Sequence, residues 1–536
     1  MPQLSDGLKR KIQANRSTFL VCMIAAFSWG LLAHAYVFLN SIISHDSLAE
    51  FNAVLLGNEF KIKSGRVFVP LYRAIARGPI TLPWLIGLLS LVYLGLTVFF
   101  MVKYFNLHSK WMIVLTSGIL IANVTVIATA SVYLHDLDSD MLALLFAVLA
   151  AYLWKRYEKG YLYGMIPAAL SLGFYQSYIS TTITLIIFDL LLFLIDGNSF
   201  QDTFKRGLRS IVMLIGGGVL YFISVKAVCL LSGIALASGQ YNSLDASASM
   251  GLSEWVITLI RSYLKVFYVF LAAQTALPST LSAVIHLIIG CLICALGLGW
   301  MIATKKHWAE KLLAVALAAV LPFGMNISYI LSGGTSHDLM HFAVWLFYLL
   351  PLLMIQHLWK RFDWSKRPIL RRGALIPYCL VAVVLWGNVR LANGAYLQRE
   401  LISNATQSLL TRIVYDMEHT EGYVPGETPV IFMQYPNLEP IPGFEANHFN
   451  GFYPDALGAA TDLYYQAYFD YVLLTPVNIA DYDVWERMYE NEEVLAMPCY
   501  PAEGSIQFVD GNLVVRMIMP QERETEHALL PQLLPD

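Results

Sequence analysis

Apolar stretches of membrane-spanning length recur along most of this sequence and are separated by polar segments. A helix needs about 20 apolar residues to cross a bilayer. Eleven stretches meet or approach that length, over 18–39, 80–102, 111–133, 140–154, 161–176, 177–195, 210–236, 280–303, 309–331, 339–358 and 373–391. The pattern predicts a polytopic α-helical membrane protein with about 11 transmembrane helices, of which the fourth to sixth are short.

Composition supports this class and divides the chain in two. Of the 536 residues, 57% are hydrophobic and 14% are charged. Soluble domains carry about 25% charged residues, so composition excludes a soluble globular protein. From residue 393 onward there are 22 Asp or Glu and 5 Lys or Arg, whereas the preceding part has 16 and 30. We therefore expect a membrane domain over 1–392 and an acidic domain over 393–536.

The acidic part has the pattern of a small α/β domain. Its expected elements are a helix over 396–418, strands over 429–433 and 471–475, a helix over 484–489 and a closing hairpin over 504–516. Asp510-Gly511 is a typical two-residue hairpin turn. No glycine loop of the nucleotide-binding kind is present.

The distribution of Lys and Arg orients the predicted helices. If the N-terminus is cytoplasmic and each stretch crosses once, the cytoplasmic segments hold 21 Lys or Arg and the outer segments hold 7. This is the positive-inside bias. The loops 40–79 and 237–279 and the acidic domain then lie outside. In the first loop we expect amphipathic helices over 47–56 and 67–75, with a break at Gly57-Asn58.

Polar side chains gather at the outer ends of these helices. Ionisable groups at membrane depth are costly and therefore often functional. Four clusters share this side, namely His45 with Asp46, Asp136 with Asp138 and Asp140, Tyr175 with Gln176, and His337 with His341. Scattered structural polar residues have no reason to choose one side, so the pattern favours a common site.

Each cluster also has a structural interpretation. Asp46 is either a catalytic base or the N-cap of a helix beginning near Leu48. The three aspartates suit a divalent cation such as Mg or Mn, or sugar hydroxyls, but also suit capping of the fourth helix. Asp140, nearest the apolar stretch, is the preferred candidate of the three. His337 and His341 lack a third ligand of the usual kind, so we favour hydrogen bonding to substrate over metal binding.

The first outer loop carries cations against the charge bias. They are Lys61, Lys63, Arg66, Arg73 and Arg77. Next to carboxylates they indicate capture of a phosphate or pyrophosphate, with lipid headgroup binding as the alternative. Lys226, within the seventh stretch, is either a ligand of a lipid phosphate or a lysine that snorkels to the surface. For Asp189 we favour a structural role.

An outer site restricts the chemistry. Nucleotide sugars are not available outside, so a transferred sugar must arrive on a lipid. Inverting transfer from a lipid phosphate needs a carboxylate to take the acceptor proton and cations to neutralise the departing phosphate. Asp46 fits the first role, and Arg66, Lys61 or Lys226 fit the second.

These residues resemble GT-C-type glycosyltransferases, and more closely the serotype-converting O-antigen glucosyltransferases of the Gtr type. The likeness rests on His45-Asp46, Gly65-Arg66, the turn Asp136–Asp140, Gly173-x-Tyr175-Gln176-Ser177, Asn393-Gly394-x-Tyr396, Thr411-Arg412-Ile413, Glu418 and Pro429-Val430. It implies a GT-C-like membrane domain that transfers glucose from an undecaprenyl-phosphate sugar to a cell-surface polysaccharide. It further implies residence in the bacterial cytoplasmic (inner) membrane. The implied functional partners are a lipid-linked-sugar synthase and a flippase.

Two other classes remain open at this point. A transporter or flippase of lipid-linked glycans is motivated by Lys226 and Asp189 within apolar stretches, although no internal repeat is visible. A non-enzymatic assembly protein would bind glycan through its outer domain and tolerate replacement of Asp46 and Asp140. We expect membrane lipids around the chain, no nucleic acid partner and no obligatory cofactor.

Overall fold

The computed structural model describes residues 6–44, 47–48, 56–78, 80–238, 246–247, 250–272, 277–304, 307–359, 372–433 and 462–517. The chain forms two compact units. The first comprises Met1–Asn40 and Gly57–Gly394, and the second comprises Ser41–Leu56 and Ala395–Asp536. The first part of the first loop, residues 41–56, therefore belongs to the same unit as the acidic tail, whereas the rest of that loop belongs to the membrane unit.

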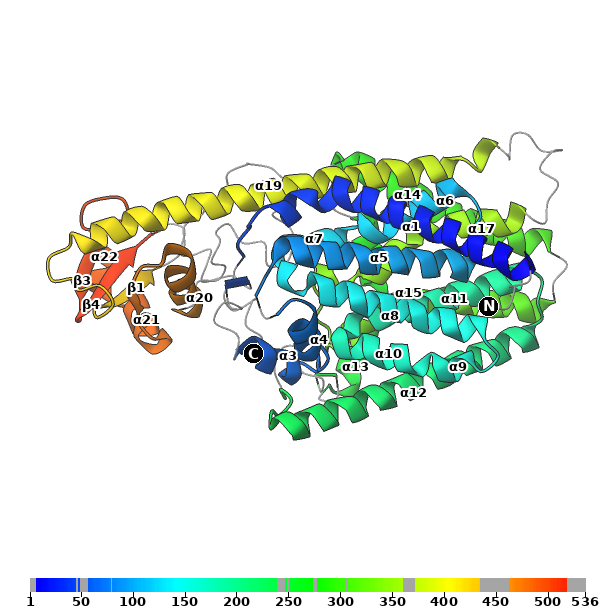
Figure 1. Cartoon of the computed structure of the whole chain (residues 1–536), viewed down its shortest axis with the longest axis horizontal. Coiled ribbons are helices and arrows are strands. Elements are labelled where there is room, and N and C mark those ends of the chain that lie inside the picture. The colour runs from blue at the N-terminus through cyan, green and yellow to red at the C-terminus, as the bar shows by residue number, and fades with distance from the viewer. Residues whose placement is uncertain are drawn as a thin grey trace. The chain divides into compact units, whose positions relative to one another are not determined.

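The first unit is a bundle of helices (Figure 1). Its long helices are α1 Asp6–Leu39, α5 Pro83–Phe105, α8 Leu137–Arg156, α11 Ile179–Ile195, α12 Phe200–Ser232, α13 Leu252–Leu271, α14 Ser279–Ala303, α15 Trp308–Met325 and the first part of α19 Ile376–Glu418. Shorter helices are α3 Leu56–Lys63, α4 Val69–Ala76, α6 Lys110–Ile121, α7 Val124–Val132, α9 Gly160–Tyr163, α10 Met165–Phe174, α16 Ile327–Leu331 and α17 Leu349–Trp359.

Within the described residues, 8 helices are long and apolar enough to cross a membrane. A ninth candidate is the pair α6 and α7, which is bent by 42°. The remaining two predicted stretches coincide with the shorter apolar helices Gly160–Phe174 and Phe342–Leu358. The protein is thus a helical membrane protein, and the apolar pattern placed its helices correctly. The exact number of crossings stays a prediction.

The bend between α6 and α7 shows how the bundle tolerates broken backbone. Asn123 caps α7 by accepting a hydrogen bond from Val126 N at 3.1 Å. The carbonyls freed at the break are bound by the His34 ring, 3.0 Å from Ile121 O, and by Asn388 Nδ2, 2.8 Å from Ala122 O. Unsatisfied backbone groups are expensive in a bilayer, so these side chains stabilise the kink.

Two local predictions in the membrane unit were wrong. The expected break at Gly57-Asn58 lies inside α3, where an i,i+4 pair between Glu59 and Lys63 at 2.6 Å supports the helix. The stretch 339–358 does not begin as an α-helix. It starts with two 3₁₀ segments, Asp338–Met340 and Phe342–Tyr348, and only then continues as α17.

The second unit contains a four-stranded sheet in the order β2-β1-β4-β3. The strands are β1 Pro429–Met433, β2 Asn478–Ile479, β3 Ile506–Val509 and β4 Asn512–Arg516. β1 is parallel to β2 and β4, and β3 and β4 form the predicted antiparallel hairpin. The other elements are the end of α19, α20 Asp462–Tyr468, α21 Tyr482–Tyr489 and α22 Glu492–Ala496.

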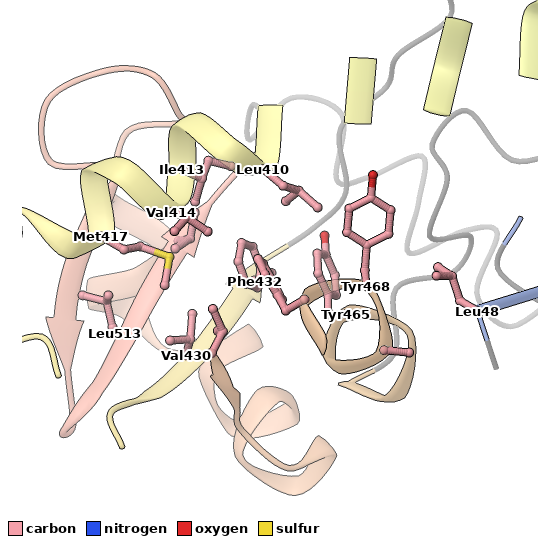
Figure 2. Close-up of a cluster of buried hydrophobic side chains, with 14 residues drawn as sticks. Leu48, Leu410, Ile413, Val414, Met417, Val430, Phe432, Tyr465, Tyr468 and Leu513 are labelled. Carbon is pink, nitrogen blue, oxygen red and sulfur yellow. The ribbon is translucent and has the colours of Figure 1, made fainter. Parts of the chain in front are cut away.

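Side chains of β1 alternate between two hydrophobic clusters, as the period of a strand requires. Val430 and Phe432 face the cluster that contains the α19 residues Leu410 and Ile413. Ile431 faces the cluster that contains α22. Figure 2 shows the first cluster, with side chains of α19, β1 and α20 directed toward one another.

Leu48 belongs to this cluster, although it is more than 350 residues away in the sequence from the end of α19. Its side chain is fully buried and packs with the tail residues around Tyr465 and Tyr468 (Figure 2). Just before it, Ser47 Oγ donates to Ser44 O at 2.7 Å, and Leu48 N donates to the same carbonyl at 3.1 Å. The start of the first loop is therefore built into the core of the second unit.

The strand predicted over 471–475 is wrong. Residues Phe469–Leu473 form a π-helix that continues α20, and the second strand is Asn478–Ile479. Tyr465 and Phe469 are four apart and stack in the first cluster, which requires helical spacing. The helix expected over 396–418 also differs, since it is the end of α19, one helix of 43 residues.

Candidate functional site

Residues 57–78 fold across the beginning of α8. The turn between α3 and α4 places Gly65 at φ +76°, and Arg66 N donates to Lys61 O at 2.8 Å. Phe68 N donates to Gly173 O at 3.1 Å. A Cβ on Gly173 would lie 2.4 Å from the Phe68 ring, so this glycine allows the turn to dock closely. The cations of the loop are thereby held near the aspartates that begin α8.

Asp136 is the centre of a buried ion-pair network. Its carboxylate accepts from Lys61 Nζ at 2.5 Å, from Arg73 Nη2 at 2.6 Å and from Arg66 Nη1 at 3.3 Å. The side chains of Lys61, Arg73 and Asp136 are 5–7% exposed. Buried charges need such compensation because removing them from water is costly. The ion pairs of Asp136 thus anchor the loop to the start of α8.

Asp138 also binds side chains of the loop. Its Oδ2 accepts from Arg77 Nε at 2.9 Å and from the Tyr72 hydroxyl at 2.9 Å. Arg77 also donates to His135 O, and its Nη1 donates to Ile80 O at 2.7 Å. The guanidinium and the carboxylate are fully buried. Together Asp136 and Asp138 fasten α4 to the bundle.

Asp140 differs from its two neighbours. It is 3% exposed, yet its carboxylate makes no hydrogen bond or ion pair with any residue in the described ranges. Its strongest electrostatic neighbours are Asp136, Arg66 and Lys61. A buried carboxylate can accept hydrogen bonds from several donors at once. Of the three aspartates, Asp140 alone has this capacity unused in the described part of the chain.

Arg66 is the cation with remaining donors. Its guanidinium carbon lies 4.3 Å from the centre of the Tyr175 ring. Its ion pair with Asp136, at 3.3 Å, is longer than those that Lys61 and Arg73 make with the same carboxylate. The Nε atom is buried and has no hydrogen-bond partner. The side chain is 16% exposed, whereas Lys61 and Arg73 are 5% exposed. A planar guanidinium of this kind matches phosphate geometry.

The segment Tyr175-Gln176-Ser177 joins the same region. Gln176 Nε2 donates to Ser64 O at 2.8 Å and to the Tyr221 hydroxyl at 3.0 Å. Tyr221 donates in turn to Gly65 O at 3.1 Å. Gln176 therefore fixes the turn that carries Arg66, and Tyr175 supplies the ring on which the guanidinium stacks.

The histidine segment also reaches this end of the bundle. Ser177 Oγ donates to Met340 O at 3.4 Å. His341 is buried, with its Nε2 at 3.0 Å from Ser336 Oγ. The spacing of four between His337 and His341 suggests one face of an α-helix, but this expectation is wrong because the intervening residues Asp338–Met340 form a 3₁₀ turn.

The remaining predicted residues lie elsewhere or outside the described residues. Lys226 is exposed on α12, with its Nζ 5.4 Å from the Phe222 ring, as a snorkelling lysine would be. Asp189 is buried and ion-paired with Lys155 and Arg206, each at 2.6 Å. His45 and Asp46 lie outside the described residues. The buried intramembrane lysine that motivated a transporter is therefore not observed.

The aspartates do not form a cation site in this structure. Among the described residues there is no group of three His, Cys, Asp or Glu side chains placed to hold a metal ion. Asp136 and Asp138 are ion-paired with basic side chains, and Asp140 makes no ion pair within the described ranges. Within the described region, Asp136 and Asp138 bind basic side chains instead of the Mg or Mn ion that the sequence suggested.

Comparison with protein families decides the class. Residues 35–355 match the family described as glucosyl transferase GtrII. The chain belongs to this family. The match covers more than half of the sequence and spans every site residue from His45 to His341. A comparison with individual curated proteins found no match. The resemblance drawn from the sequence is confirmed, and membership of the GtrII family implies glycosyltransferase activity.

Sequence reasoning missed several members of this cluster in the GtrII-family chain. Arg73 and Arg77 were counted as loop cations but not as partners of particular aspartates, and Tyr72 and Tyr221 were not identified. The signal for the arginines was their i,i+4 spacing, although Arg77 is the C-cap of α4 and lies just after the helix. Nothing in the local sequence of Tyr221 distinguishes it from other aromatic residues of α12.

Proposed function

We propose that this GtrII-family protein moves a glucosyl unit from a polyprenyl-phosphate donor to a cell-surface polysaccharide, with inversion at the anomeric carbon. Family membership supports glucosyl transfer in general. The finer proposal is carried by one observation: the partly exposed Arg66 and the buried Asp140 lie at the same end of the bundle, and the Asp140 carboxylate makes no hydrogen bond or ion pair within the described ranges. Arg66 offers an anion-binding donor and Asp140 offers a hydroxyl-binding acceptor.

Arg66 is proposed to bind the donor phosphate. Its buried Nε and its weak contact to Asp136 leave donors for a phosphate oxygen. Charge-assisted hydrogen bonds of this kind strengthen as the phosphate departs with its full negative charge. Lys61 contributes positive potential while keeping its pair with Asp136.

Asp46 is proposed as the base and Asp140 as a ligand of sugar hydroxyls. The acceptor hydroxyl gives its proton to the Asp46 carboxylate, its oxygen forms the new bond to the anomeric carbon, and the bond to the phosphate oxygen breaks. The polyprenyl phosphate then leaves as an anion next to Arg66. Tyr175 and Gln176 hold Arg66 in place, and His337 and His341 are proposed to contact the substrate.

The proposed location is the bacterial cytoplasmic membrane, with this end of the bundle and the C-terminal unit on the outer side. The distribution of Lys and Arg supports this orientation. Because the donor must reach the outer face, a synthase that makes the lipid-linked sugar and a flippase that delivers it are proposed functional partners.

The test is transfer of labelled glucose from a polyprenyl phosphate to polysaccharide by the purified full chain. Asp46→Asn and Arg66→Ala should lose activity. The matched controls Glu50→Gln, in the same loop, and Lys63→Ala, an exposed cation on α3, should keep it. A fully active Asp46→Asn protein would falsify the assignment of the base. No transfer by the parent chain, together with cellular glycan assembly that survives replacement of both Asp46 and Asp140, would favour a non-enzymatic assembly role. Movement of lipid-linked sugar without transfer would favour a flippase.

A further inference from the structure

A second polar cluster lies at the other end of α8. Figure 1 shows α3 and α4 beside the beginning of this helix and α9 near its end. α8 has 20 residues, so about 30 Å separate the two ends. A cavity of about 220 Å³ opens there, lined by Trp154, Lys155, Arg156, Tyr157, Glu158, Tyr161, Arg206 and Arg209. This cavity is distinct from the Asp136 network.

The cavity carries more positive than negative charge. Four of its lining residues are cations and one, Glu158, is an anion. Beneath it the buried carboxylate of Asp189 pairs with both Lys155 and Arg206, at 2.6 Å each. One carboxylate thus serves two cations. Arg156 and Arg209 are exposed and make no ion pair with any residue that the structure describes.

Two of the four cations, Lys155 and Arg206, are held in place by aromatic rings and by Asp189. The Arg206 guanidinium lies 4.9 Å from the Trp154 ring and 4.8 Å from the Phe193 ring, and Lys155 Nζ lies 4.7 Å from the Tyr104 ring. Arg206 Nε is buried without a hydrogen-bond partner. Aromatic stacking and the shared carboxylate fix these side chains before any ligand binds, which lowers the entropic cost of binding.

The surroundings favour a ligand with a phosphate group and an apolar body. The cavity is smaller than the 300 Å³ or so of a site for a drug-sized molecule, so it fits a headgroup. Beyond it, α12 presents an exposed apolar face whose residues Leu208, Ile211 and Ile215 are 52–63% exposed. Basic pockets between membrane helices are typical binding sites for anionic lipid headgroups.

We propose that this cavity binds the phosphate group of an anionic lipid, with Arg156 and Arg209 as the principal ligands and Arg206 in support. The lipid chains would then lie along the apolar face of α12. The same cations can hold free phosphate, and the experiment separates these two sources. The site is independent of glucosyl transfer, since it lies at the opposite end of α8 from Arg66 and Asp140.

The test uses the full chain in nanodiscs and follows retained lipid by native mass spectrometry. The double variant Arg156→Ala/Arg209→Ala should bind phosphatidylglycerol about thirtyfold more weakly, since each cation contributes about fivefold. The matched control is Lys159→Ala/Lys205→Ala, which removes two exposed cations of the same segments that do not line the cavity.

Two arms distinguish the sources. Thermal stabilisation of the parent by phosphatidylglycerol, lost only in the arginine variant, supports a lipid ligand. Stabilisation by inorganic phosphate in zwitterionic nanodiscs, lost in the same variant, supports a free phosphate. If the arginine and lysine variants bind both ligands equally well, or if the parent binds neither, the proposal is wrong.

Discussion

Asp136 directly precedes α8 and Asp140 lies in its first turn, and replacing each by asparagine should have opposite consequences. Asp136→Asn keeps the shape of the side chain but removes the negative charge that Lys61 and Arg73 contact at 2.5 and 2.6 Å. Both cations are 5% exposed, so water does not replace the carboxylate. Breaking a buried ion pair from one side costs about 3–5 kcal/mol. For a unit of this size that cost lowers Tm by about 4–6 °C.

Asp140→Asn removes a buried carboxylate that has no ion pair in the described ranges and lies close to Asp136. The Tm of this variant should stay within the error of the parent or rise. Glucosyl transfer should fall, because the sugar hydroxyls lose the carboxylate that accepts their hydrogen bonds. Both variants are compared in detergent by tryptophan fluorescence during heating and by the transfer assay. A large fall in Tm for Asp140→Asn, or parental stability for Asp136→Asn, would refute the division of these residues into substrate ligand and loop anchor.

Three further substitutions probe other parts of the molecule. Arg66→Lys keeps the charge but loses the planar fork, so kcat/KM for the lipid donor should fall about tenfold to a hundredfold in steady-state assays; an unchanged value would contradict phosphate binding by Arg66. Leu48→Ala should cost about 2–5 kcal/mol and raise hydrogen exchange across the second unit, whereas unchanged exchange would show that the leucine is not part of its core. Burial, together with the hydrogen bond to Asp416, raises the pKa of Tyr500 to about 12. The neutral Tyr500 therefore stabilises the folded state below pH 10, and this stabilisation is lost as pH rises from 10 to about 12. Tyr500→Phe should flatten the fall of Tm with pH in that window, and a profile identical to that of the parent would contradict this role of Tyr500.

The helices of the membrane unit were predictable because long apolar stretches are a strong signal. All eleven predicted stretches coincide with helical segments of the described chain, although two are short and one is bent. The ends were less predictable. The failure at 471–475 arose because local β propensity competes with packing, and burial of Phe469 beside Tyr465 decided for a helix.

The segments that meet around Asp136 were predictable from the sequence, but the pairing of their charges was not. Charge on an outer loop and carboxylates at a helix start suggested one region, and the structure brings the loop cations and the aspartates together, whereas Lys226 lies elsewhere. Which aspartate is neutralised depends on contacts between residues 61 to 75 positions apart, such as Arg77 with Asp138 and Lys61 with Asp136. No local pattern encodes such pairs. Only the structure shows that Asp140, unlike Asp136 and Asp138, makes no ion pair within the described ranges.

The burial of Leu48 in the second unit has a consequence for how the chain matures. Leu48 leaves the ribosome early, but its neighbours Tyr465 and Tyr468 are synthesised more than 400 residues later. At about 5–20 residues per second, this part of the core waits some tens of seconds for its completion. A chain shortened before α20 would therefore lose the contacts that anchor the first part of its first loop, which bears Asp46. Truncation of the tail should inactivate the enzyme even if no tail residue ever touches a sugar.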